Sequence, residues 1–363
     1  MTNRFLFYCL VVVLLTACRG REYDSLAFEP PVFPEARQVV VTYLPGNYIF
    51  DDVLMQMFGV DDFILLNAYS EGRYLHLFDK ETGTHLRSFA HYGRGPGEFL
   101  APPKCHIDEN DNTLYTYEGF NGQSRYRSYR VKEMLQGNLP LPYKEESIQF
   151  SKREGERFPG GARLLFAWQD KRFFSRNRNY RFEVQDTMGN TLCLYDHFPK
   201  QAMPPDIDSS GLRRCYSIYS DAALKPDMGK FVFTSSLGCI MEIFTINESG
   251  QIVREAEKHF LPAIYQDNKS SIGFIDKKTI FGIGGFYVTD DYIYAQYDGG
   301  VYNERERRVY DKHLAVFDWD GNPVCLYVLD WGIRTFFIDE EQNRCYLVGI
   351  DANDEILMGY FDL

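Results

Sequence analysis

The sequence lacks the motifs that mark several classes of enzyme and metal site. It contains no Cys-x-x-Cys pair, so a zinc-binding or thioredoxin-like centre has no support. It also contains no Gly-x-Ser-x-Gly and no His-Glu-x-x-His, and its 7 histidines are scattered. Positive charge is scarce as well: 39 Lys and Arg against 51 Asp and Glu leave a net charge of −12. Because proteins that bind nucleic acid present a basic face, we expect no nucleic-acid partner. The missing motifs lead us to expect no cofactor either.

Long apolar runs are missing too, apart from one at the N-terminus. Phe5–Leu15 follows the positive Arg4 and is too short for a stable membrane span, as in a signal peptide. It ends in Leu15-Thr16-Ala17-Cys18, which resembles the bacterial lipobox. That resemblance implies cleavage before Cys18 and a diacylglycerol on its thiol, through which the protein would contact a membrane. An ordinary secretory peptide with a chance cysteine is the alternative.

The chain therefore divides into three predicted parts. We expect residues 1–17 to be the signal peptide, 18–37 to be the lipidated cysteine and a tether, and 38–363 to be the folded domain. Three prolines between residues 30 and 34 favour an extended tether. The predicted location is the cell envelope, on the outer membrane.

Six further cysteines follow Cys18. They are Cys105, Cys193, Cys215, Cys239, Cys325 and Cys345. An exported protein meets an oxidising compartment, so an even set invites disulfides. Several of these residues lie in strand-like apolar runs, where an unpaired cysteine behaves as a small hydrophobe. We expect mostly free, buried thiols and leave one disulfide open.

Aromatic residues make up 16% of the chain, and they fall into a repeat. In each unit apolar residues, an Asp- or Asn-rich turn and an alternating aromatic and β-branched run follow one another, which is a hairpin signal. The turns fall near residues 62, 111, 171, 229, 291 and 343, about 50 to 60 residues apart. A second polar turn, closed by glycine, follows in runs such as Leu77–Gly83 and Val316–Gly321. Six units of four strands, a to d, predict an all-β fold, the six-bladed β-propeller with antiparallel strands.

The two ends of the domain complete one another. The last unit supplies strands a (Ile333–Ile338), b (Arg344–Ile350) and c (Ile356–Phe361) but no fourth strand. Gln38–Thr42, at the start, has no partner in its own neighbourhood. We predict that this N-terminal strand pairs with the C-terminal blade, which closes the ring and leaves no bare sheet edge.

The stretch Gly93–Phe99 holds three glycines and a proline in seven residues. A phosphate-binding P-loop would need Lys-Ser/Thr and a following helix, whereas Pro102 and Pro103 preclude that helix. The stretch is better explained as the crossing from strand d of blade 1 to strand a of blade 2. Within it, Arg94 and Glu98 are expected to brace the loop through an ion pair, or to contact a ligand.

This stretch, the lipobox and the repeat together resemble the TolB-like (NHL-like) six-bladed propeller lipoproteins of Gram-negative gut anaerobes. The resemblance covers essentially the whole mature chain. It implies a cell-envelope lipoprotein whose biochemical role is mostly unassigned, and it transfers no catalytic residue.

Acidic pairs at the a–b turns, such as Asp61-Asp62 and Asp290-Asp291, raise the question of a metal site. The set Asp108-x-Asn110-x-Asn112 lacks the central glycine of a calcium loop, and its twelfth position is Gly119 rather than glutamate. Because Asp and Asn are good turn formers, we predict no metal.

The long connections favour one face of the propeller. Three of them join strand d to strand a: Gln149–Gly161, Phe198–Arg214 and Leu261–Thr279. A fourth, Asp298–Asp311 of blade 5, joins strands b and c and opens on the same face. This connection and its flank hold the candidate ligand-binding residues Tyr297, Tyr302, Glu304, Arg305 and Arg307. Aromatic and guanidinium groups suit stacking on sugars or pairing with acids, although solvated charge on a tolerated insertion is the plainer account.

The predicted function is non-catalytic binding of a glycan or an envelope protein by a monomeric propeller. One alternative is an enzyme, a polysaccharide lyase or hydrolase with a site at the channel mouth. The other is a structural subunit of an envelope complex. A deep pocket of carboxylate, His or Tyr groups with shifted pKa values would favour the enzyme. A channel plugged by apolar side chains would favour binding.

Overall fold

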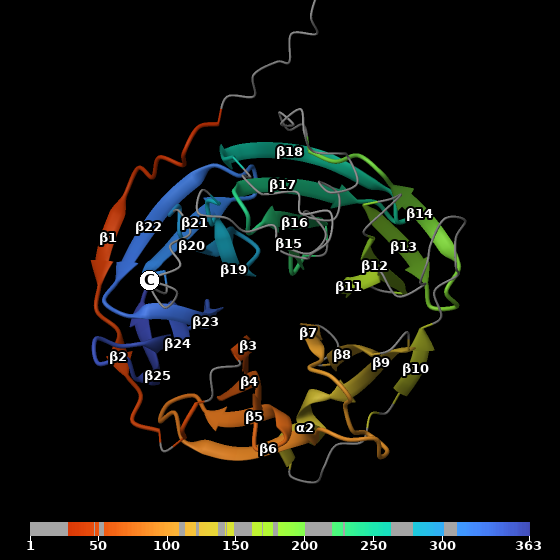
Figure 1. The fold of residues 1–363 in the computed structure, drawn as a ribbon, viewed down its shortest axis with the longest axis horizontal. Helices are drawn as coiled ribbons and strands as arrows, with labels where there is room; N and C mark the ends of the chain where they lie inside the picture. The colour runs from red at the N-terminus through yellow and green to blue at the C-terminus, as the bar shows by residue number, and fades with distance from the viewer. Residues whose placement is uncertain are drawn as a thin grey trace, which may run out of the picture.

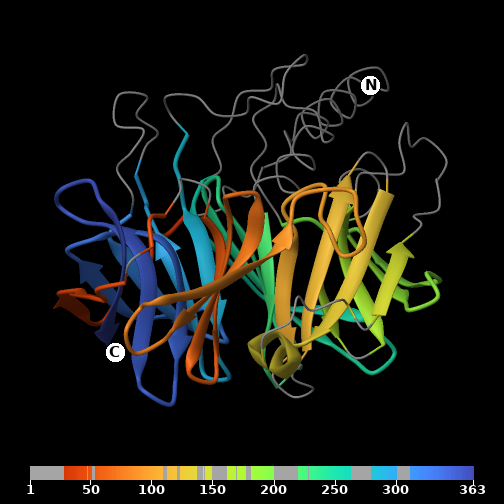
Figure 2. The same cartoon turned by 90° about the horizontal axis from the view of Figure 1, so that it is seen from below.

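The computed structural model is a ring of six β-sheets, the blades, around a central channel (Figure 1). The structure describes residues 28–46, 48–50, 54–108, 113–120, 123–136, 142, 144–148, 162–168, 170–176, 181–199, 220–227, 229–262, 279–300 and 311–363. Each blade has four antiparallel strands, and one blade carries a fifth, parallel strand. The strands run along the axis of the ring (Figure 2). The predicted six-bladed propeller is confirmed.

The strands are numbered in chain order and given from the channel outward. Blade 1 consists of β3 (Leu54–Val60), β4 (Phe63–Ser70), β5 (Arg73–Asp79) and β6 (His85–His91). Blade 2 consists of β7 (Lys104–Asp108), β8 (Thr113–Phe120), β9 (Gln123–Arg130) and β10 (Lys144–Ile148). Blade 3 consists of β11 (Ala162–Trp168), β12 (Lys171–Arg176), β13 (Phe182–Asp186) and β14 (Thr191–Tyr195). Blade 4 consists of β15 (Ser220–Leu224), β16 (Lys230–Ser235), β17 (Cys239–Ile246) and β18 (Ile252–Leu261). Blade 5 consists of β19 (Ile283–Val288), β20 (Tyr292–Tyr297), β21 (His313–Asp318), β22 (Pro323–Leu329) and β1 (Ala36–Val39). Blade 6 consists of β23 (Gly332–Asp339), β24 (Arg344–Ile350), β25 (Ile356–Asp362) and β2 (Thr42–Tyr43). Helix α2 (Val131–Gln136) follows β9, and none of the helices in these residue ranges is long and apolar enough to cross a membrane.

The polar turns between strands c and d follow the local chemistry predicted from the sequence. Their closing glycines Gly83, Gly189, Gly250 and Gly321 all have positive φ, between 69° and 84°, which favours glycine. An Asp or Asn that ends strand c then accepts a backbone hydrogen bond across the turn. Asp318 Oδ1, for example, accepts from Asn322 N at 2.8 Å.

The N-terminal run closes the ring, but it divides between two blades. β1 pairs in parallel with β22 and becomes the fifth strand of blade 5. Only β2, two residues long, pairs antiparallel with β25 and completes blade 6, with Thr42 opposite Tyr360. Between them Val41 N donates a hydrogen bond to Asp330 Oδ1 at 2.9 Å, which directs the chain from one blade to the next. The predicted closure is confirmed, although Gln38–Thr42 is not one continuous strand.

An apolar cluster lies between each pair of neighbouring blades. The cluster between blades 2 and 3 contains Tyr117, Tyr126 and Phe174. Charged groups support it, since Arg172 of β12 stacks 4.8 Å above the Tyr126 ring and pairs with Glu146 of β10. In β9, strand c of blade 2, the buried Arg127 pairs with Glu118 of β8 and Glu145 of β10, so ion pairs account for part of the polar sequence of this strand.

Five of the cysteines lie in the described ranges, and all five are free thiols: Cys105, Cys193, Cys239, Cys325 and Cys345. Four are buried, and burial raises the pKa of Cys239 to about 12, which keeps this thiol protonated and unreactive. This agrees with the expectation of mostly free, buried thiols. Cys215 lies outside the described residues.

Candidate functional site

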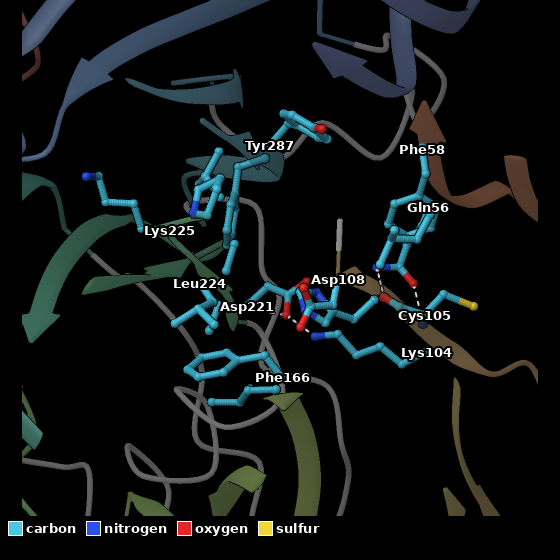
Figure 3. Close-up of a pocket in the computed structure, with 18 of the residues that line it drawn as sticks. Gln56, Phe58, Lys104, Cys105, Asp108, Phe166, Asp221, Leu224, Lys225 and Tyr287 are labelled. Carbon is cyan, nitrogen blue, oxygen red and sulfur yellow. Dashed lines mark hydrogen bonds and ion pairs between the residues drawn. The ribbon is translucent and has the colours of Figure 1, made fainter. Parts of the chain in front are cut away.

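The inner strands of five blades enclose a cavity of about 420 Å³ in the central channel (Figure 3). β3, β7, β11, β15 and β19 supply its walls, and the turns that follow β15 and β19 form part of its rim. Blades that converge on an axis leave such a space wherever their inner strands stand apart. The channel is therefore not plugged by apolar side chains along its whole length.

An ion pair crosses this cavity. Lys104, the first residue of β7, lies 2.6 Å from Asp221 of β15, measured from Nζ to Oδ1. The two strands belong to blades 2 and 4, which are not neighbours, so the pair spans the space in front of blade 3. Asp221 Oδ1 also accepts a hydrogen bond from Ala222 N at 2.9 Å, which orients the carboxylate. The side chains are 22% and 49% exposed, so the pair remains in contact with solvent.

Side-chain amides of blade 1 fix the strand that carries Lys104. Gln56 Oε1 accepts from Cys105 N at 2.8 Å, and Gln56 Nε2 donates to Cys105 O at 3.1 Å, so that one amide satisfies both backbone groups. The buried Asn67 donates from Nδ2 to Pro103 O at 2.8 Å. β7 is thus held against blade 1 while its lysine reaches into the channel.

A second group of charges occupies the rim at the a–b turns. Lys225 pairs with Asp227, and Asp290 Oδ1 accepts a hydrogen bond from Asp227 N at 2.9 Å. Burial opposes ionisation of Asp227, but the hydrogen bonds from Lys225 and Gly229 outweigh it and lower the pKa of this carboxyl. The rim charges therefore satisfy one another.

The remaining walls combine aromatic and aliphatic residues with Gln56, His106 and Asp108. Phe166 stacks on Phe173 with ring centroids 4.7 Å apart, which fixes its ring. Figure 3 shows Phe166 and Leu224 on one side of the ion pair, with Tyr287 and Phe58 farther round the cavity. A charge pair within an apolar enclosure is a common composition of small-molecule sites.

The glycine-rich crossing proves to be a structural joint. Glu98 turns back onto its own loop, and its Oε2 accepts from Gly95 N at 2.5 Å. A Cβ at Gly95 would lie only 2.9 Å from this carboxylate, and Gly97 has a φ of 76°. The buried Arg127 of blade 2 holds the loop from below: it donates to Glu98 O at 2.9 Å and lies 4.4 Å from the Phe99 ring centre.

Arg94 is exposed on this crossing, and no ion pair joins it to Glu98 in the described part of the chain. The predicted brace is therefore wrong in its partner, because the Gly95 amide takes that role. Neither Arg94 nor Glu98 lines the cavity.

Tyr297, predicted to recognise a ligand, ends β20 and packs inward. It is half-buried, and its ring lies 6.2 Å from that of Phe33. Burial raises the pKa of Tyr297 to about 12. The other predicted residues, Tyr302, Glu304, Arg305 and Arg307, lie outside the described residues, as does Cys18.

Two carboxyls, those of Asp298 and Asp311, flank the b–c connection of blade 5. Burial raises the pKa of Asp311 to about 7, and the charge of Asp298 and a hydrogen bond with it add to the effect. A carboxyl with a pKa of about 7 is protonated in roughly half of the molecules at neutral pH. The pair lies apart from the residues that line the cavity.

The sequence analysis missed Lys104 and Asp221. Neither residue has a recognisable motif around it. They meet only because the ring brings the inner strands of blades 2 and 4 toward one axis. The faint signal was charge on innermost strands, which lie in the interior of the ring.

Comparisons with known proteins agree with this architecture. A member of the DUF4221 family from Bacteroides vulgatus is similar in structure, with a TM-score of 0.57 and 12% identity over 89% of this chain and 97% of that one. A Bacteroides fragilis protein whose name provisionally calls it exported has a TM-score of 0.50 and 11% identity over 90% of this chain and 99% of that one. No curated protein matches the chain. The model of the TolB-like 6-blade propeller-like family matches residues 33–341, and this chain belongs to that family.

Proposed function

We propose that this protein is a lipid-anchored propeller of the cell envelope that binds a small polar ligand in its channel and releases it unchanged. The cavity between the inner strands carries the proposal. Its 420 Å³ lies within the roughly 300–1,000 Å³ of small-molecule sites, and it combines apolar walls with a charge pair.

Binding is favoured over lyase or hydrolase chemistry by the ion pairs that hold two of the acidic groups of the cavity, Asp221 and Asp227. A general acid needs a carboxyl that keeps its proton near neutral pH. Asp221 instead pairs with Lys104, and Asp227 pairs with Lys225 and has a lowered pKa. Carboxylates held in ion pairs suit recognition better than proton transfer.

The envelope location rests on the lipobox-like run that ends at Cys18. The provisional name of the Bacteroides fragilis protein adds support, because it describes a protein of similar fold as exported. The connection that holds Tyr302 and Arg305 is a proposed second contact surface, for a glycan or an envelope protein.

Thermal shift measurements test the proposed channel site. We expect at least one member of a panel of free amino acids, dipeptides and oligosaccharides to raise the melting temperature of the full mature chain. Ala223→Phe, which places a ring in the cavity, should remove that shift. Ala36→Phe, exposed on the outer strand β1, adds the same ring elsewhere and should retain it. A panel without effect on the native protein would refute channel binding.

A further inference from the structure

The ion pair across the cavity has a composition that identifies a class of ligand. We propose that the occupant of the channel is a zwitterion, an amino acid or short peptide, whose carboxylate pairs with Lys104 and whose ammonium group pairs with Asp221. This inference rests on the proposed channel site and specifies what that site takes.

The two charges are anchored at their backbones but not locked together. β7 is held by Gln56 and Asn67, and Asp221 is oriented by the Ala222 amide. The Lys104 ammonium, by contrast, sits on a flexible four-carbon stem. The gap between the two groups can therefore widen by side-chain rotation, without movement of either blade.

The exposure of the pair makes its exchange inexpensive. An ion pair whose side chains are 22% and 49% exposed stabilises the protein only weakly, because water screens it. A ligand that supplies both a carboxylate and an ammonium group restores both interactions in a drier environment. A ligand with one charge would restore only one of these two interactions. The pair thus selects for both charges in one molecule.

Lys104 and Asp221 supply the ion pair that crosses the cavity. At the rim Lys225 and Asp227 neutralise one another, and Asp290 accepts from the Asp227 amide. Asp108 lies at the opposite end of β7 from Lys104. The walls beside the pair, Phe166 and Leu224, are apolar and suit the side chain of an amino acid.

Calorimetric titration with four probes tests the inference: phenylalanine, phenylalanine amide, N-acetylphenylalanine and the dipeptide Ala-Phe. We expect the two zwitterions to bind at least about tenfold more tightly than either blocked form, because each blocked form lacks one charge-assisted contact. Lys104→Met should make phenylalanine and its amide bind alike. Asp221→Asn should do the same for phenylalanine and its N-acetyl form.

Lys258→Met, on the outer strand β18, is the matched control and should keep the native preference. Melting temperatures of all variants without ligand establish that they fold. Equal affinity for blocked and unblocked probes would overturn the inference. If only sugars of the wider panel bind and Ala223→Phe abolishes their binding, the channel site stands and the zwitterion assignment fails. If no compound binds, both fail.

Discussion

Buried polar residues of this propeller are joined into short chains of hydrogen bonds, and His76 shows the pattern. This residue of β5 is 1% exposed. Its Nδ1 lies 2.8 Å from Ser88 Oγ and 3.1 Å from the hydroxyl of Tyr48, and its Nε2 lies 3.1 Å from Ala68 O. Burial lowers the pKa of His76 to about 4, so the ring is neutral in the folded protein at physiological pH.

Acid should therefore destabilise the fold through this histidine. The unfolded chain takes up the proton near pH 6.5, whereas the folded protein takes it up only near pH 4. Stability contributed by the neutral ring is complete above pH 6.5 and is lost as the pH falls toward 4, by on the order of 3 kcal/mol. Denaturant unfolding between pH 4 and 8 measures this loss.

His76→Gln should flatten that pH dependence, whatever its effect on absolute stability. His197→Gln replaces a side chain that is 76% exposed and serves as the control. A His76→Gln protein with the native acid slope would show that other groups cause the loss.

At the scale of elements, features set by neighbouring residues could be predicted from the sequence, whereas features set by contacts between blades could not. The turns were predictable because their determinants lie within a few residues, as Asp318 and Gly321 illustrate. The split of the N-terminal run was not, because it depends on β22 and β25, which lie at the other end of the chain. Burial of Arg127 likewise depends on Glu118, Glu145 and the crossing loop of blade 1.

Among the site residues the same distinction holds. Glu98 was recognised from its setting in a glycine-rich run. Its partner was misassigned because a pattern of charged residues does not show which backbone amide a carboxylate will accept from. Lys104 and Asp221 had no local signal at all, since 117 residues separate them.

The closing strand provides a test at this scale. A Cβ at Gly359 of β25 would lie 2.6 Å from Val41 Cγ1 and 2.7 Å from Thr42 O, so Gly359→Ala should displace β2. We expect a loss of about 1–3 kcal/mol in the free energy of unfolding, the usual result of forced overpacking. Gly285→Ala in β19 meets nothing closer than 3.7 Å and is the control. Equal unfolding midpoints for the two variants in urea would contradict the role given to β2.

For the whole molecule, the course of the N-terminal segment defines how an anchor would hold the propeller. Phe28 packs against His259 of blade 4 with ring centroids 5.8 Å apart, and Glu29 N donates to His259 O at 3.2 Å. Phe33 then contacts Phe317 of blade 5 at 5.6 Å. The chain between Cys18 and Phe28 spans at most about 35 Å when extended, so a lipid on Cys18 would keep the rim of blade 4 close to the membrane.

Cys18→Ser should move the protein from the membrane fraction to the soluble fraction of the cell envelope, because the proposed lipid is attached to this thiol. Cys193→Ser, which changes a half-buried free thiol of β14, should leave the distribution unchanged. Immunoblots of fractionated cells measure both. Retention of Cys18→Ser on membranes would contradict lipid anchoring at this residue.

Blade 6 is closed by strands that lie far apart in the sequence, so a delay separates the synthesis of one strand from that of its partner. β2 ends at Tyr43, and its partner β25 begins at Ile356. At about 5–20 residues per second, the partner is made roughly 15 to 60 s later. During that interval β2 has no sheet to join, and a chain that stops before Ile356 never provides one. Completion of the fold therefore depends on synthesis of β25, and a chain truncated before this strand is left with an open ring that quality-control proteases can recognise.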